Sequence, residues 1–515
     1  MSAVRAEAGG AIKVDLDHGA AAETVAAPNA SLETVARGVS WTVVGRAVGQ
    51  GSWYGSLLAL AILVPPSAFG AVAVGSVIVA ITTLLMESGT GGAIVVASEV
   101  TAGHLRRAVL RTGSAALVMC AVAAVLAGPI MRLFAPGGNP NVLRVMLLAV
   151  VLAAFSIVPM ALLKKMLQFR RQALVLIGAA IAASVLAIGT AVAGAGVWAL
   201  VTRIVAYQGF VTALAWVAVL DLLPRRHEGS GITSHRRRAT SPWFMVIALA
   251  AFSAQTFDNL IVGHFTNVRS LGLYAMAFAL GLAPTTQISW QIGGVLFPAM
   301  AATRDPTQLA QRTLKAMRLM ALILLPLVPP AVILAPTLIP AVMGHKWAGM
   351  VTPFQVLIVV GIVQGIMNVM AEALAAGRGL VARAWIDGTW ATLTIAAVVI
   401  GVKLGGITGA AYGHLVMLVV VVAAYLCFGA SRVGLTARAV IVNVRGPAAA
   451  VLVQAACTSL LFVALRRLDV PSAAAACAAA VVGFGALALV LRRAAPELLA
   501  EVREVVQAAL RRRKN

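Results

Sequence analysis

The sequence predicts an all-α polytopic membrane protein, and its composition, its hydropathy and its long apolar runs each support that fold class. Of the 515 residues, 61% are hydrophobic and only 11% are charged, whereas soluble globular domains carry about 25% charged residues. The mean hydropathy of +0.96 is typical of a chain whose solvent is mostly lipid. This composition excludes a soluble fold.

Apolar segments of spanning length follow one another along the chain from Trp41 onward. A membrane-spanning helix needs about 20 mostly apolar residues, and the sequence predicts about fourteen such helices. Pro284 interrupts the eighth segment and Pro326 the ninth, which membrane helices tolerate where neighbours satisfy the freed carbonyls. The predicted spans are 41–63, 70–86, 113–134, 141–163, 174–193, 197–220, 243–265, 271–297, 316–340, 351–376, 385–403, 407–428, 447–466 and 471–491.

The residues outside these spans predict the orientation. Residues 1–36 lack the order of a cleavable signal and are expected to form a disordered cytoplasmic tail. Lys and Arg are concentrated in alternate loops, which include a basic linker at 224–241, and such loops stay in the cytoplasm. Both termini are therefore expected there, with the basic tail 492–515 on anionic lipid. This placement explains the net charge of +23 without a nucleic acid partner.

Three weak internal similarities predict two related halves. They pair Phe69-Gly70-Ala71 with Leu271-Gly272-Leu273, Arg111 and Pro129 with Arg318 and Pro336, and Gly194 and Ala199 with Gly405 and Ala410. Their order is the same in both halves, as in transporters built from repeated bundles, although apolar helices also resemble one another by chance. The expected layout is two six-helix lobes, 37–223 and 242–430, with two appended helices in 431–491.

Polar residues inside the first span share one helical face. Arg46 and Gln50 are followed by Trp53 or Tyr54 at the spacing of successive helical turns. If this face lines a cavity, the guanidinium of Arg46 offers a planar fork for phosphate, and the aromatic rings can cover sugars. The alternative is that Arg46 extends to the lipid headgroups while the small residues around it pack against another helix.

Two further spans carry intramembrane charges, which are functional candidates by default. Arg203 and Tyr207 lie one turn apart, and Arg203 could bind an anionic substrate or form an ion pair with a neighbouring helix. Gln255, Asp258 and Asn259 form another stripe. Asp258 could bind a coupling proton or sodium ion, pair with Arg203, or accept hydrogen bonds from sugar hydroxyls.

The tenth span carries Gln364, Asn368 and Glu372 at four-residue spacing, again on one face. We predict that the two amides line the cavity, and Glu372 is a second candidate for ion coupling. Glu372 also lies near Arg378 and Arg383 in the sequence, so an interfacial salt bridge is the alternative.

Signatures of catalysis and of cofactor binding are missing from the sequence. It contains neither the phosphate-binding pattern G-x-x-x-x-G-K-[ST] nor the zinc pattern H-E-x-x-H, so no ATP site, metal or cofactor is expected. The four cysteines fall in apolar stretches without metal-ligand spacing. His264 and His414 are expected to be packed polar residues, and Gln287 and Gln291 to make interhelical hydrogen bonds.

Seven short motifs between residues 37 and 428 resemble the polysaccharide transporter family of the multidrug, oligosaccharidyl-lipid and polysaccharide exporter superfamily. Two departures stand out, because His264 replaces a frequent Arg, and Gln255-Thr-Phe-Asp258 stands where Arg-Asn-Leu-Asp is common. The matching motifs are Trp41-Thr-Val-Val-Gly-Arg46, Pro159-x-Ala-Leu-Leu with Leu167-Gln-Phe169, Gly194-Ala-Gly-Val-Trp-Ala-Leu200, Asp258-Asn-Leu-Ile-Val-Gly263, Leu271-Gly-Leu-Tyr274, Leu296-Phe-Pro298-Ala and Gly344-His-Lys-Trp347.

The resemblance implies a two-lobed bundle that opens alternately to either side of the plasma membrane around a central cavity. It implies a flippase, not an enzyme, that moves undecaprenyl-pyrophosphate-linked oligosaccharides for exopolysaccharide, capsule or O-antigen synthesis. Its partners would be the lipid-linked sugar, membrane lipids, and the polymerase and glycosyltransferases of the same pathway. A cation-coupled drug or metabolite exporter of the same superfamily is the alternative, but its cavity should be acidic where Arg46 and Arg203 stand. A membrane glycan polymerase or acyltransferase would need large outer loops, which the sequence lacks.

Overall fold

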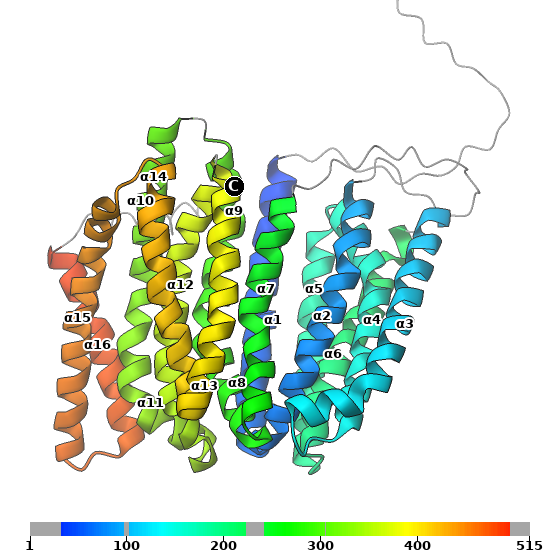
Figure 1. The fold of residues 1–515 in the computed structure, drawn as a ribbon, viewed down its shortest axis with the longest axis horizontal. Helices are drawn as coiled ribbons and strands as arrows, with labels where there is room; N and C mark the ends of the chain where they lie inside the picture. Colours follow the sequence, from blue (N-terminus) through cyan, green and yellow to red (C-terminus); the bar gives the residue numbers. More distant parts are fainter. Residues whose placement is uncertain (1–31, 97–101, 223–241, 304, 378, 495–515) are drawn as a thin grey trace, which may run out of the picture.

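The computed structural model describes residues 32–96, 102–222, 242–303, 305–377 and 379–494, and these residues form long helices joined by short turns. No β-strand occurs among the described residues. The helices stand side by side with roughly parallel axes (Figure 1). The all-α class predicted from the sequence is thus confirmed for the described part of the chain.

The first half of the chain forms one helix for each predicted span. Each helix contains the predicted apolar run, or nearly all of it, and several extend beyond it, because a helix continues past the residues that lie in lipid. The helix α1 begins inside the predicted tail 1–36, the remainder of which lies outside the described residues. The bounds are α1 Leu32–Leu63, α2 Pro66–Val96, α3 Ala102–Phe134, α4 Pro140–Lys165, α5 Phe169–Val192, α6 Val197–Val219 and the short turn η1 Leu220–Leu222.

The second half has the same number of predicted spans before the appended helices, but two of those spans are broken. The linker 224–241 and the tail after Ala494 lie outside the described residues. The bounds are α7 Pro242–Phe265, α8 Val268–Gly281, η2 Thr285–Ser289, α9 Trp290–Ala301, α10 Pro306–Leu324, η3 Leu325–Leu327, α11 Val328–Met343, η4 His345–Met350, α12 Val351–Ala376, α13 Leu380–Ala424, η5 Tyr425–Gly429, α14 Ala430–Arg432, α15 Ala437–Arg467 and α16 Ser472–Ala494.

Prolines break the helices where the sequence predicted. The α8 helix ends at Gly281, shortly before Pro284, and the chain continues through the π-helical turn η2 into α9. The break between α10 and α11 contains Pro326. Proline lacks an N–H and crowds the preceding turn, so it releases a backbone carbonyl. The carbonyl of Pro326 has no helical partner four residues on, because Pro330 also lacks an N–H. The side-chain amide of Gln454 on α15 donates a hydrogen bond to this carbonyl at 3.0 Å, which connects an appended helix to the break.

The long helix α13 consists of two antiparallel parts, as expected from the predicted spans 385–403 and 407–428. Its backbone leaves the helical conformation at Gly405 and at Gly406, where φ is 58°. Gly401 and Gly409 then face one another so closely that a Cβ on either would overlap the carbonyl oxygen of the other. Small residues permit this approach of two membrane helices.

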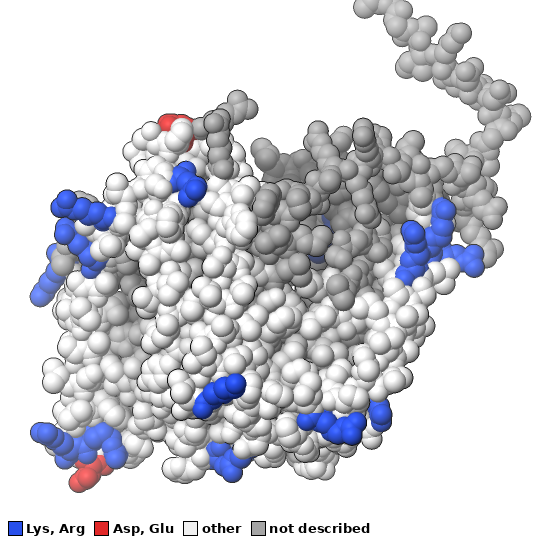
Figure 2. All heavy atoms as spheres, in the orientation of Figure 1, with Lys and Arg blue, Asp and Glu red and all other residues white. Residues whose placement is uncertain are grey.

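Ten of the described helical segments are long and apolar enough to cross a membrane. One of them, 380–432, joins both parts of α13, and therefore this number does not test the predicted count of fourteen. Charged side chains also separate as expected, because most Lys and Arg atoms lie near the upper and lower edges in Figure 2. The almost uncharged band between the edges fits the hydrocarbon of a bilayer. The chain is therefore a multi-pass membrane protein.

Corresponding helices make corresponding contacts in the two halves of the chain. The α1 helix packs on α5 and α2 on α4, while α7 packs on α13 and α8 on α12. The last two helices of each half are also joined by a glycine of the same unusual conformation. Gly196 has φ 56° and ψ −121°, and Gly406 has φ 58° and ψ −141°. Only glycine readily adopts this backbone conformation. The chain therefore reverses direction through the same glycine conformation in both halves.

The two halves meet where α2 and α8 begin. A Cβ on Gly70 would overlap the carbonyl oxygen of Val268, and a Cβ on Gly272 would overlap that of Pro66. The contact is reciprocal, and it joins the two glycines that the internal similarity had paired in the sequence. We call Gly70 and Gly272 the glycine contact. It fixes how closely the halves approach at the lower end of the bundle in Figure 1.

A second contact between the halves lies at the same end, and we call it the α1 cap. The ammonium of Lys346 donates hydrogen bonds to the carbonyls of Ile62 at 2.7 Å and Val64 at 3.1 Å. The indole of Trp347, which is fully buried, donates to the carbonyl of Ala61 at 2.8 Å. The last carbonyls of a helix have no partner within it, and a cation there also favours the helix dipole. The motif Gly344-His-Lys-Trp347 therefore holds the end of α1.

Candidate functional site

Aromatic side chains and an arginine from α1 and α6 gather within the membrane-spanning part of the first half. The guanidinium carbon of Arg203 lies 3.6 Å from the ring centre of Trp53, and its Nη2 donates to the carbonyl of Trp53 at 3.2 Å. The rings of Trp53 and Tyr207 meet edge to face at 5.6 Å. The amide of Gln287, from η2 in the other half, donates to the hydroxyl of Tyr54 at 3.4 Å. We call these five residues the arginine–aromatic site.

Arg203 is buried, and none of the described carboxylates pairs with it. It is only 4% exposed, and its Nε makes no hydrogen bond within the described residues. No ion pair joins Arg203 to Asp258 or to another described acid. The interpretation that Arg203 pairs with Asp258 is wrong, because Asp258 is held on other helices. The cation is instead stabilised by the face of an indole, which leaves donors for an anion.

Several other residues predicted from the sequence make no polar contact that the structure describes. Gln50 is half-buried on α1, but it makes no hydrogen bond with another described residue. Arg46 lies in α1 and Gln255 in α7, and their side chains lie outside the described residues. The same applies to Gln291 on α9. Whether Arg46 lines a cavity therefore stays a prediction.

Asp258 belongs to a second buried cluster in the other half. Its Oδ2 accepts a hydrogen bond from the hydroxyl of Tyr274 at 3.0 Å and lies 3.6 Å from Nε2 of His414. Its Oδ1 accepts from the backbone N–H and the side-chain amide of Asn259, at 2.8 and 3.3 Å. Asp258, Tyr274 and His414 come from α7, α8 and α13, and they are 3%, 0% and 5% exposed. We call these three residues the aspartate cluster.

The predicted stripe on α12 divides into two parts. The amides of Gln364 and Asn368 are half-buried and make no hydrogen bond with another described residue, so they are free to meet a solute. Glu372 is paired with Arg383, whose two terminal nitrogens lie 3.2 and 3.3 Å from its oxygens. The pairing of Glu372 with Arg383 follows the salt-bridge alternative raised from the sequence, whereas Arg378 lies outside the described residues.

The acid and base of this pair belong to a larger polar group. The Nε of Arg383 lies 3.3 Å from Oδ2 of Asp387, and Tyr425 donates to Oδ1 of Asp387 at 2.6 Å. Sequence reasoning raised the pair of Glu372 with Arg383 but missed Asp387 and Tyr425. Asp387 lies in the eleventh predicted span, and Arg383, four residues before it on the same helical face, was the signal that could have found it.

Three of the residues that complete the two clusters were not among the predicted site residues. Trp53 was considered only as an alternative to Tyr54 on the same face, and it provides the ring under Arg203. Tyr274 lay in a recognised motif without an assigned role, and His414 was expected to be a packed polar residue. Their contacts join separate helices, so a local pattern could place Trp53 on a polar face but could not give the partners of these three residues.

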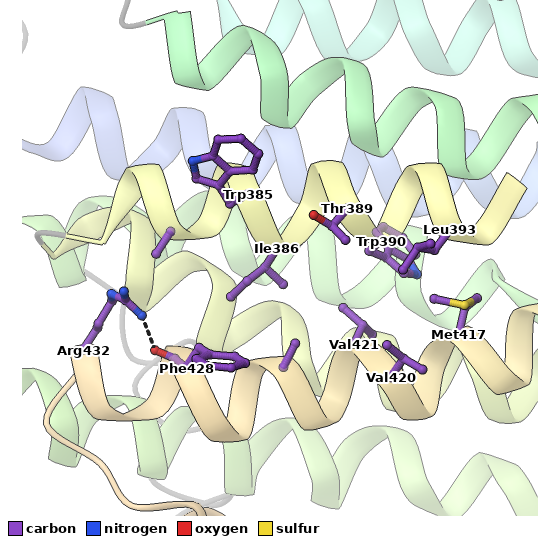
Figure 3. A pocket seen from close by; sticks show the side chains of 12 residues that line it. Trp385, Ile386, Thr389, Trp390, Leu393, Met417, Val420, Val421, Phe428 and Arg432 are labelled. Atoms are coloured by element: carbon purple, nitrogen blue, oxygen red, sulfur yellow. Dashed lines mark hydrogen bonds between the residues drawn. The ribbon is translucent and has the colours of Figure 1, made fainter. Parts of the chain in front are cut away.

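A groove of about 400 Å³ lies between the two parts of α13. Figure 3 shows apolar side chains along both walls, with Trp385 and Phe428 toward the end where Arg432 donates to the carbonyl of Phe428 at 2.8 Å. None of the predicted site residues lines this groove. Groups of three or more His, Cys, Asp or Glu that could hold a metal are absent from the described residues.

The arrangement of helices is similar to that of a solved lipid flippase. The lipid II flippase MurJ, in an inward closed conformation, matches with a TM-score of 0.66 and 11% sequence identity. The match covers 89% of this chain and 100% of that one. At this identity the likeness establishes the fold alone.

Two curated relatives cover most of the chain. The succinoglycan biosynthesis transport protein ExoT of Rhizobium meliloti is 23% identical over 398 residues, 76% of this chain and 79% of ExoT. The lipopolysaccharide biosynthesis protein WzxC of Escherichia coli is 23% identical over 409 residues, 75% of this chain and 79% of WzxC. A model of the family described as "Polysaccharide biosynthesis protein" matches residues 59–352, more than half of the chain. This multi-pass membrane protein therefore belongs to the polysaccharide biosynthesis protein family.

Proposed function

We propose that this protein is a plasma-membrane flippase that moves undecaprenyl-pyrophosphate-linked oligosaccharides from the cytoplasmic to the outer leaflet by alternating access. The observation that carries the proposal is Arg203, a buried cation that lies over the ring of Trp53 and has no carboxylate partner in the described part of the chain. A fixed guanidinium binds phosphate oxygens through two parallel hydrogen bonds. The rings of Tyr54 and Tyr207 beside it offer apolar faces and hydroxyls that suit a sugar.

The position of this site supports transport between the two halves of the chain. Tyr54 belongs to the first half and Gln287 to the second, and the hydrogen bond between them crosses the interface. The half-buried amides of Gln364 and Asn368 on α12 would complete the sugar-binding surface. We propose that the lobes 37–223 and 242–430 close around the diphosphate and the first sugars, while the lipid tail stays in the membrane.

We propose that the contacts at the lower end of the bundle belong to one state of this cycle. The glycine contact and the α1 cap hold the two halves together at the end that the positive-inside pattern places outside the cell. We therefore assign the structure to a state that is shut toward the outside. Export requires both contacts to part, after which the sugar can leave on the outer side.

The names of the relatives support the same substrate class. ExoT is named for transport in succinoglycan biosynthesis, and WzxC for lipopolysaccharide biosynthesis. An exporter of cationic drugs would need acidic groups where Arg203 stands, so this residue favours the lipid-linked sugar. The polymerase and the glycosyltransferases of the pathway are the partners that this function requires.

Deleting the gene should distinguish a flippase for lipid-linked sugars from an exporter of cationic drugs. Lipid-linked oligosaccharide should accumulate in the inner leaflet and polymer should disappear from the surface, and a plasmid copy should reverse both effects. Sensitivity to cationic dyes such as ethidium should stay the same. Unchanged polymer together with increased sensitivity to dye would replace this proposal with drug export.

The orientation can be tested with a reporter that is active only outside the cell. Fused at residue 230, inside the basic linker 224–241, it should stay inactive, because this loop is expected in the cytoplasm. The same reporter fused after Gly137, in the turn between α3 and α4, should be active. Activity at residue 230 would reverse the orientation and with it the side on which the glycine contact lies.

Transport should not require ATP hydrolysis, because the sequence carries no phosphate-binding loop. Purified protein in liposomes should move a lipid-linked sugar when no nucleotide is present. A strict requirement for ATP in this minimal system would contradict the proposal that the protein hydrolyses nothing.

A further inference from the structure

The charge balance of the aspartate cluster points to a ligand. The groups that face Asp258 are Asn259 on its own helix, Tyr274 on α8 and His414 on α13. No Lys or Arg of the described residues forms an ion pair with Asp258. If Asp258 is ionised and His414 neutral, the cluster holds one unbalanced charge. A buried charge without a partner is costly, and one added proton removes it.

The geometry also shows where that proton fits. Oδ2 of Asp258 accepts the hydrogen bond of Tyr274 and faces Nε2 of His414 at 3.6 Å. That Nε2 is buried and has no hydrogen-bond partner among the described residues. A proton on Oδ2 would give this nitrogen a donor after an approach of about 0.6 Å, since O–H···N and N–H···O bonds are near 3 Å or shorter. A single proton thus balances the charge and satisfies the imidazole.

We propose that Asp258, together with Tyr274 and His414, binds the proton that drives transport, and this inference rests on the proposed flippase function. One proton enters from the outside, bonds to the carboxylate of Asp258, and later leaves to the cytoplasm, while one lipid-linked sugar moves outward. No covalent bond of the sugar lipid forms or breaks. After each cycle the cluster returns to its starting charge.

The helix α7 links this proton to the contact between the halves. At 1.5 Å per residue, His264 lies about 9 Å along the helix from Asp258. Nδ1 of His264 lies 3.0 Å from the carbonyl oxygen of Leu133 on α3, and a Cβ on Gly263 would overlap the carbonyl of Phe134. Protonation that draws α7 toward α8 and α13 therefore changes the position of the segment that touches the other half.

The first test measures proton binding without any sugar. Purified full-length protein in lipid nanodiscs is studied by infrared difference spectroscopy between acidic and neutral pH. The band of a protonated carboxyl should be present in the wild type and lost in Asp258→Asn. His414→Gln and Tyr274→Phe should keep the band but shift the pH at which it forms, which a purely structural role would not do. An unchanged spectrum in Asp258→Asn would overturn the proton site.

The matched control is Asp221→Asn. Asp221 is exposed and paired with Arg171 at 2.6 Å, so the same carboxyl-to-amide change is made outside the cluster. This variant should retain the buried carboxyl band of the wild type. Loss of the same band in Asp221→Asn would mean that the band does not report on Asp258.

The second test measures coupling. Protein in liposomes is given undecaprenyl diphosphate N-acetylglucosamine, and the outer side is made one pH unit more acidic. One coupled proton should raise the equilibrium ratio of probe in the outer to the inner leaflet by about tenfold. Asp258→Asn should abolish this accumulation, whereas Asp221→Asn should keep it.

The two tests fail in different ways. If the wild type moves the probe but the gradient has no effect, the proton proposal is overturned and the flippase proposal stands. If the infrared band is lost in Asp258→Asn but the wild type never moves the probe, the flippase proposal and the coupling fall, and only a proton site remains.

Discussion

Replacing Arg203 by alanine should abolish export of the lipid-linked sugar, whereas lysine should retain part of it. Lysine keeps the charge but loses the planar fork that binds two phosphate oxygens at once. A lost charged hydrogen bond costs about 1.5 to 3 kcal/mol, or roughly tenfold to a hundredfold in affinity. The measurement is the rate at which undecaprenyl diphosphate N-acetylglucosamine moves across liposomes, with binding of the same probe measured in detergent. Arg46→Ala, predicted from the sequence, belongs in the same series.

Two comparison variants show whether Arg203 binds the substrate or only packs against its neighbours. Arg144→Ala removes an exposed arginine of the same half, whose hydrogen bonds within the described residues go to Asn141 and to the carbonyl of Ala124, and it should transport normally. Trp53→Phe keeps a ring under Arg203 but with a weaker attraction for the cation, so a smaller loss is expected. If well-folded Arg203→Ala binds and moves the probe like the wild type, Arg203 is a packing residue and the proposed phosphate site is wrong.

Adding one methyl group at the glycine contact should force the two halves apart at the predicted outer end. In Gly70→Ala or Gly272→Ala the new Cβ would overlap a backbone carbonyl of the other half, which cannot turn away as a flexible side chain would. Overpacking of this kind costs about 1 to 3 kcal/mol, so the shut state should lose roughly tenfold to a hundredfold in population. Transport should fall strongly, because each cycle needs this state.

The opening can be measured with one reporter cysteine. Ala61 is fully buried, and its carbonyl accepts the hydrogen bond of Trp347 in the α1 cap. Ala61→Cys should therefore react slowly with a maleimide that cannot cross the membrane. The exposed Cys427 and Cys477 and the partly exposed Cys457 are first changed to serine, so that the only other cysteine is the buried Cys120. Gly70→Ala and Gly272→Ala should each raise the labelling rate at least tenfold.

The matched control is Gly128→Ala, because a Cβ at this α3 glycine would meet no atom within 4 Å. It should leave labelling and transport unchanged. Equal labelling of Ala61→Cys in all three glycine variants would contradict the assigned role of the glycine contact. Equal slow labelling of the two contact variants, with normal transport, would show that the halves tolerate the methyl group without opening.

The predicted spans and breaks succeeded because each depends on residues that are neighbours in the chain. Helical apolar runs, the break at Pro326 and the reversal at Gly406 follow from local chemistry that tertiary structure does not change. The pairing of Gly70 with Gly272 came from the internal similarity. That similarity gave only their correspondence, and the structure adds that the two glycines touch.

A polar stripe predicts which residues share one face of a helix, but it does not predict which residues of other helices contact that face. The predicted contacts of the stripes were therefore only partly correct. Arg203 and Tyr207 come together as their spacing requires, yet the ring under Arg203 comes from α1, 150 residues away. Asp258 and Asn259 are also neighbours as predicted, but the partners of Asp258 are Tyr274 and His414. Each pairing depends on the rotation and depth of separate helices.

By itself, the sequence of this protein determined that it is an all-α membrane protein of polysaccharide biosynthesis, where most of its helices lie, and which polar residues fall inside apolar helices. Only the tertiary structure decided that Arg203 is held by Trp53 and not by Asp258, and that Asp258 faces His414. The physical reason is that composition and periodicity depend on residues within one helix. The partner of a buried charge lies on another helix, and which helix that is depends on how the helices pack.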